Sequence, residues 1–83
     1  MHEVGIAEQI LDAVRTETAA RKPARATKVG VRIGEMAGVD PDSLTFCFNV
    51  LVKGSDLDPL ELAIEAGKTD ELEFAYLELE DEP

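Results

Sequence analysis

Apolar residues recur at helical spacing near the start of the chain. Ile6, Ile10, Leu11 and Val14 fall at positions i, i+4, i+5 and i+8, which places them along one side of a helix. We predict this helix over residues 4–21, ending before Pro23, because a proline disfavours helical geometry in the residue that precedes it.

A second helical segment begins at Asp40. The Asp40 carboxylate is suited to capping a helix, Pro41 fits the first helical position, and Gly54 is a natural end. The apolar stripe of this helix consists of Leu44, Cys47, Phe48 and Leu51, and it is widened by Phe46 and Val50. We therefore expect this helix to be well covered and Cys47 to be a buried, structural thiol.

Three other segments alternate between apolar and polar residues, as half-buried strands do. Residues 27–34 form the first segment, residues 60–65 the second and residues 71–80 the third. In the third segment the alternation slips at Tyr76–Leu77, which indicates a bulge.

The predicted element order is α-β-α-β-β, in a single α/β domain over residues 1–83. A β-α-β unit places its two strands in parallel. The connection at residues 66–69 is too short for a crossover, so we predict an antiparallel hairpin between the second and third strands. The expected fold is a small three-stranded mixed sheet with both helices on one face.

The charges are numerous and unevenly distributed. Eighteen acidic and eight basic residues give a net charge of -10, which disfavours nucleic acids and anionic membrane surfaces as partners. Six of the eight basic residues lie within residues 15–32, and this basic stripe is a candidate docking surface for an acidic partner. We found no segment long enough to span a bilayer and no apolar signal core, so the expected location is the cytoplasm.

The chain has few side chains that could catalyse a reaction, and we expect no enzymatic activity. Ser43 and Ser55 have no candidate base except the terminal His2, and Gly67-Lys68-Thr69 lacks the upstream glycine of a phosphate-binding loop. The single cysteine cannot build a Cys-rich zinc site.

The N-terminus carries a different kind of chemistry. Because methionine aminopeptidases act when residue 2 is small, we expect His2 to preserve Met1 and its amine. The amine of Met1, the backbone nitrogens of His2 and Glu3, and the His2 imidazole then lie within chelating reach of one ion. Four such nitrogens suit a planar Ni(II) or Cu(II) ion rather than tetrahedral zinc.

Several motifs resemble those of one family across nearly the whole chain. The Met1–Glu3 start, Ile33-Gly34, the run from Gly38 to Pro41, and Phe46-Cys47-Phe48 are similar to motifs of the HypA/HybF nickel metallochaperones. This resemblance implies a domain that binds Ni(II) and delivers it during maturation of nickel–iron hydrogenase, and in some organisms of urease. It implies Met1, His2 and Glu3 as nickel ligands, and a HypB-type GTPase and the hydrogenase large subunit as partners.

One departure from the family is large. The family carries a zinc module with two Cys-x-x-Cys pairs between the second and third strands, where this sequence has only residues 66–69. We therefore expect no zinc in this chain. The short connection also leaves a strand-swapped homodimer open. The alternative to nickel delivery is a protein-interaction module that engages the GTPase or the hydrogenase precursor without carrying nickel.

Overall fold

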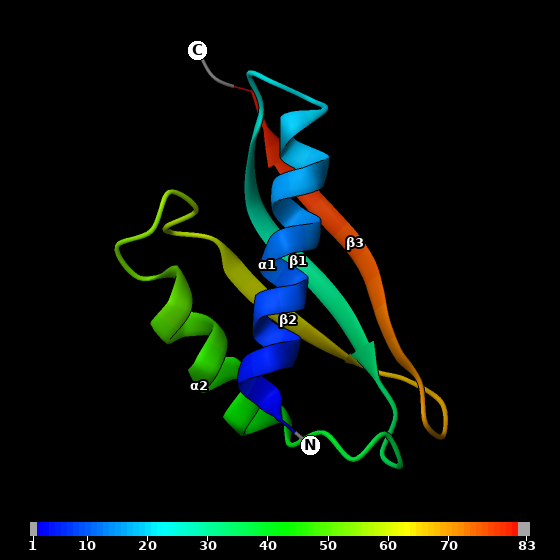
Figure 1. Cartoon of the computed structure of the whole chain (residues 1–83). Helices are drawn as coiled ribbons and strands as arrows, with labels where there is room; N and C mark the ends of the chain where they lie inside the picture. Colours follow the sequence, from blue (N-terminus) through cyan, green and yellow to red (C-terminus); the bar gives the residue numbers. More distant parts are fainter. Residues whose placement is uncertain (1, 82–83) are drawn as a thin grey trace.

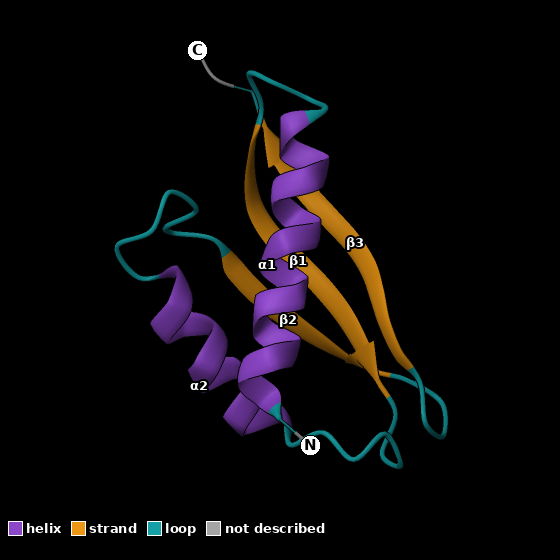
Figure 2. Ribbon diagram, viewed as in Figure 1, coloured by secondary structure: helices purple, strands orange, loops and turns teal. Residues whose placement is uncertain are grey.

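Two helices lie against one face of a three-stranded sheet (Figures 1 and 2). The structure is a computed structural model, and it describes residues 2–81. The elements are α1 (Glu3–Ala19), β1 (Arg25–Ile33), α2 (Pro41–Val52), β2 (Glu61–Ala66) and β3 (Leu72–Glu80). This α-β-α-β-β order and the mixed sheet confirm the predicted fold class.

The start of α2 confirms the predicted cap. The Asp40 side chain accepts hydrogen bonds from the backbone N–H groups of Asp42 and Ser43, and Pro41 occupies the first turn. These bonds satisfy two of the N–H groups that lack a partner within the helix.

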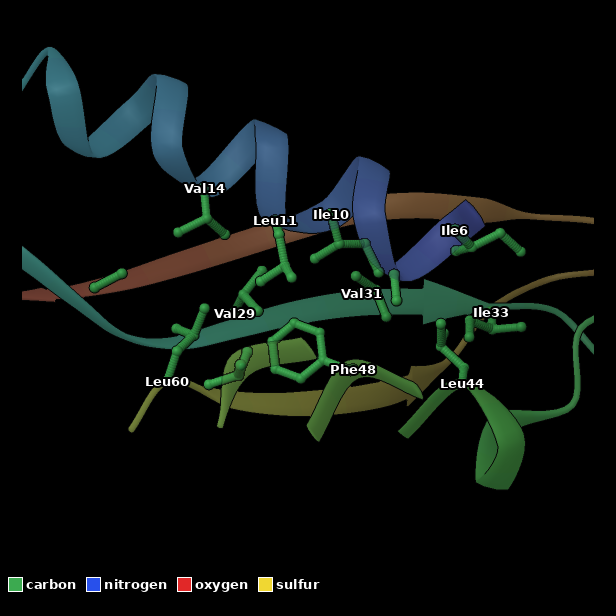
Figure 3. Close-up of a cluster of buried hydrophobic side chains, with 13 residues drawn as sticks. Ile6, Ile10, Leu11, Val14, Val29, Val31, Ile33, Leu44, Phe48 and Leu60 are labelled. Carbon is green, nitrogen blue, oxygen red and sulfur yellow. The ribbon is translucent and has the colours of Figure 1, made fainter. Parts of the chain in front are cut away.

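The core lies between the helices and the sheet (Figure 3). Its largest fully buried side chains are Phe48, Leu44, Val14, Val29 and Val31. They come from α1, β1 and α2, so the most deeply buried strand residues belong to β1.

The order of the strands corrects one prediction. The sheet runs β2-β1-β3, so β1 lies in the middle, parallel to β2 and antiparallel to β3. The predicted hairpin between the second and third strands is therefore wrong. Residues 67–71 instead carry the chain across the end of β1, where the Gly67 N–H donates to the Ile33 carbonyl and the Gly34 N–H to the Glu71 carbonyl.

The charges on the strands give a physical reason for this order. On the sheet face away from the helices, Lys28 is level with Glu61 of β2 and Glu78 of β3, and Arg32 is level with Glu65 and Glu73. A β2–β3 hairpin would instead bring two acidic strands together, and like charges directly opposite each other destabilise a sheet. Each acidic strand therefore pairs with the basic one.

The predicted bulge is present next to Tyr76. Gly30 pairs with Tyr76 and Val31 with Phe74, so Ala75 is the extra residue on β3. This extra residue explains why the apolar positions change phase along the strand.

The predicted burial of α2 is partly wrong. Leu44, Phe48 and Val52 are buried, whereas Phe46 and Val50 are exposed. Cys47 is half-buried against the edge of the core. The helix packs on one side only, so apolar residues two positions away from the buried stripe face solvent.

Candidate functional site

The chain enters α1 at the predicted metal-binding terminus. His2 is the N-cap residue with an extended backbone (φ -86°, ψ 92°), and Glu3 is the first helical residue. The His2 side chain is exposed and makes no capping hydrogen bond, and Glu3 is half-buried. Met1, the third predicted ligand, lies outside the described residues.

The backbone at this point suits ligation by nitrogen. The first N–H groups of a helix have no acceptor within the helix, and those of His2 and Glu3 occupy such positions. The His2 carbonyl accepts the first helical bond, from the Ile6 N–H at 3.3 Å. A metal bound to the His2 and Glu3 nitrogens would therefore replace no hydrogen bond within the helix.

The Glu3 carboxylate joins the two helix N-termini. Its Oε2 atom accepts a hydrogen bond from the Asp40 backbone N–H at 3.2 Å. Asp40 in turn caps α2, so the starts of α1 and α2 lie side by side, as Figure 1 shows. The sequence identified Asp40 only as a cap, because a contact made through its backbone leaves no signal in the residue type.

The side chains offer no alternative metal centre in the part of the chain that the structure describes. Within residues 2–81 no group of three or more His, Cys, Asp or Glu side chains is arranged to hold a metal ion. A metal bound at the N-terminus would thus depend on backbone nitrogens and the His2 imidazole.

The basic stripe is largely engaged within the chain. Arg15 pairs with Asp56, Arg21 with Glu17, and Arg25 with Glu80. Arg32 pairs with Glu65, Glu71 and Glu73. These residues are also divided among α1, the turn that follows it and β1, so the stripe seen in the sequence is not one continuous positive surface.

The Arg15–Asp56 pair ties α1 to the turn before β2. The Arg15 Nη2 atom lies 2.8 Å from Asp56 Oδ1, and this hydrogen bond holds the pKa of Asp56 below its usual value. Because the folded-state pKa is lowered, the pair stabilises the fold above the unfolded-state pKa of about 3.9. Its contribution is lost as the pH falls through the lower, folded-state pKa.

We therefore expect Asp56→Asn to lower the melting temperature at neutral pH but not in strong acid. The difference from the unmodified chain should shrink as the pH falls below about 3.9, because both chains then lack the charge. Thermal melts followed by circular dichroism across this pH range measure it. A difference that stays constant with pH would mean that Asp56 acts through packing and not through its charge.

Hydropathy gives one further result on the helices. Neither α1 nor α2 is long and apolar enough to cross a membrane, within the residues that the structure describes.

Comparison with known proteins gives a consistent result. A family model described as hydrogenase/urease nickel incorporation, metallochaperone, HypA matches residues 1–73. Proteins named hydrogenase maturation factor HypA are similar to the chain, including one from Chlorobium limicola that is 39% identical over 71 residues. Those from Desulfosudis oleivorans and Streptomyces avermitilis are 42% identical over 67 residues and 40% identical over 68 residues.

The matches cover most of this chain but only part of its relatives. They span 80% of the chain for the Chlorobium limicola protein and 78% for each of the other two. They span 61%, 57% and 50% of those three proteins, respectively.

Proposed function

The chain belongs to the HypA family, and on that premise we propose that it is a Ni(II)-binding metallochaperone domain serving the maturation of nickel–iron hydrogenase. The observation that carries the proposal is the extended N-cap at His2, whose side chain makes no capping hydrogen bond, beside backbone nitrogens that have no acceptor within the helix. Nickel is the cargo of such a domain, and no catalytic step is required of it.

The proposed ligands are the amine of Met1, the backbone nitrogens of His2 and Glu3, and the His2 imidazole. Deprotonation of the two amides supplies two negative charges that balance Ni(II). The complex would then be close to neutral, so the positive end of the α1 dipole would not repel it strongly.

The chelate requires one rotation at His2. At ψ 92° the His2 and Glu3 nitrogens are not on the same side of the Cα–C bond, as a five-membered chelate ring requires. The His2 carbonyl is held by the helix through Ile6. Rotation about this bond would therefore move only the His2 side chain, its nitrogen and Met1, and would leave α1 in place.

We propose further that the domain acts in the cytoplasm as a single unit, residues 1–83, without zinc. Its proposed partners are a HypB-type GTPase and the hydrogenase large subunit. The second candidate is an interaction module that engages these proteins without nickel. The hydrogen bond from the Asp40 N–H to the Glu3 carboxylate is equally compatible with this candidate. A titration with Ni(II) separates the two candidates, because only the metallochaperone binds one ion per chain.

The GTPase is expected to bind the α1 side of the molecule. Charge reversal at Arg15 and Arg21 should weaken this binding and make it less sensitive to salt, because attraction to an acidic partner would be lost. Isothermal titration calorimetry at two ionic strengths measures both effects.

The Arg15 ion pair calls for a matched control in that experiment. Reversing Arg15 also breaks its bond to Asp56, whereas Asp56→Asn breaks the same bond and keeps the positive charge. If both changes weaken binding of the GTPase, the binding depends on the turn that the Arg15–Asp56 pair holds in place. An unchanged affinity after charge reversal would place the interface elsewhere.

A further inference from the structure

Strand β3 is covered unevenly by the helices. An apolar groove of about 200 Å³ runs between α1 and β3, lined by Ile6, Gln9, Ile10, Ala13, Val31, Leu72, Glu73 and Phe74. A second hollow, of about 400 Å³, continues along the strand and is lined by Glu17, Arg21, Phe74, Leu77 and Leu79. Phe74 lines both, so the two hollows form one seam.

The apolar side chains along this seam are partly exposed. Leu72 keeps 43% and Phe74 keeps 37% of its surface accessible, although both are level with buried residues of β1, Ile33 and Val31. Together with Leu77 and Leu79 they form a row on the helix side of β3, which we call the β3 apolar row. It continues the core surface and is only partly covered by α1.

The backbone of β3 offers a second feature. β3 is an edge strand that pairs only with β1 among the described residues. An edge strand presents a row of N–H and C=O groups that can pair with an added strand.

The opposite face of the sheet supplies a third feature, which is its charge. Six acids lie on or beside this face, against the three bases Arg25, Lys28 and Arg32; the acids are Glu61, Glu65, Glu71, Glu73, Glu78 and Glu80. Arg32 is shared among three of them, so one guanidinium faces three carboxylates. The face therefore keeps a negative charge next to the β3 edge.

From these three features we propose that the edge of β3 is a docking site for an extended segment of a partner protein in which apolar residues alternate with lysine or arginine. Because successive side chains of a strand point to opposite faces, the apolar residues of such a segment would extend the β3 apolar row above the seam. Its basic residues would lie beside Glu73 and Glu78. This proposal does not depend on nickel binding.

A second copy of the chain fits the site less well. Two β3 strands side by side would place the same acidic residues against each other, and like charges across strands are destabilising. Charged residues on an edge strand act against self-association in this way, while they attract a basic segment.

A synthetic peptide in which valine alternates with lysine tests the proposal. We expect it to bind, to slow amide hydrogen exchange along β3, and to shift the NMR signals of β3 and of the groove side of α1. A peptide in which valine alternates with glutamate should not bind. Lysine peptides with the valines grouped together should bind weakly, because their apolar residues cannot all face the seam.

Two changes in the chain should each weaken binding of the valine–lysine peptide roughly tenfold. Phe74→Ala removes the side chain shared by the two hollows. The double change Glu73→Lys and Glu78→Lys reverses the charge beside the edge and should also remove the salt dependence. Phe46→Ala is the matched control, because Phe46 is an exposed phenylalanine on α2, away from β3, and its loss should leave binding unchanged.

These measurements distinguish a basic partner segment at β3 from a second copy of the chain. Circular dichroism confirms that each variant is folded. No binding of the lysine peptide, equal binding of the glutamate peptide, or shifts confined to α2 would each overturn the proposal. Dimerisation seen by sedimentation and abolished by Phe74→Ala would also overturn it, since a second copy would then be the occupant.

Discussion

A chain that begins at Met1 is expected to bind one Ni(II) ion, and His2→Ala is expected to weaken this binding by more than about 100-fold. The imidazole is one of four proposed ligands, and loss even of groups that only support a ligand costs about 10–100-fold in metal affinity. Isothermal titration calorimetry with an untagged chain measures the affinity. Absorption spectroscopy of the bound ion tests for the planar, nitrogen-rich geometry.

The role of the Met1 amine is tested by extending the chain. A few residues added before Met1 convert its amine into an amide, and binding should fall as much as it does in the His2→Ala variant. An extended chain that binds Ni(II) as tightly as the unmodified one would show that the amine is not a ligand.

Glu3→Gln is the matched control for these changes. It keeps the Glu3 backbone nitrogen but weakens the acceptor of the Asp40 N–H, so Ni(II) affinity should stay close to that of the unmodified chain. A loss comparable to that of His2→Ala would instead assign the carboxylate a direct place at the metal. Cu(II) should bind at least as tightly as Ni(II), following the usual order of divalent metals.

The affinity should also fall steeply as the pH is lowered. Ligation by two amide nitrogens releases two protons, and protons compete with the metal for these sites. Repeating the titration in buffers of different ionisation enthalpy gives the number of protons released. Release of no protons would contradict ligation by the amides.

Periodicity was sufficient to predict the elements of this fold, because each element has one side that must be buried. The spacing of Ile6, Ile10 and Val14 predicts the buried side of α1, and the alternation around Val29 predicts that of β1. The Asp40–Pro41 pair predicts the start of α2 to the residue. These signals are local, so they can be recognised without knowledge of the tertiary structure.

Strand order was not predicted, because it depends on relations between segments. A short connection is usually a hairpin, yet residues 67–71 pass over the end of β1. The relevant signal was the charge of Lys28 and Arg32 between two acidic strands. Similarly, the exposure of Phe46 depends on which side of α2 meets the core, and the apolar pattern alone was too broad to decide it.

The candidate site could be predicted only as far as its residue types. Position 2 and the chemistry of histidine point to a chelate, and the resemblance to the family names the same three residues. The link from Glu3 to Asp40 could not be predicted, since it joins a carboxylate to a backbone N–H 37 residues away. That contact depends on how α1 and α2 pack together.

Replacing Gly34 is expected to destabilise the fold by about 2–4 kcal/mol, because it lies beneath the connection that crosses β1. In Gly34→Ala the new Cβ atom would overlap the backbone oxygen of Thr69 and lie 2.6 Å from that of Lys68. Both are backbone atoms, so neither can move aside as a flexible side chain would. Relieving the overlap would strain the bonds from Gly34 to Glu71 and from Met36 to Thr69, each 2.8 Å long.

Gly5→Ala provides the matched control for this prediction. Apart from its chain neighbours and the backbone of its own helix, no atom lies within 4 Å of the position that its Cβ would occupy, and alanine favours a helix over glycine by up to about 1 kcal/mol. Urea denaturation should therefore show Gly5→Ala as stable as the unmodified chain or more so, and Gly34→Ala with a much lower midpoint. Equal midpoints for Gly34→Ala and the unmodified chain would contradict the close crossing of residues 67–71 over β1, and with it the β2-β1-β3 order.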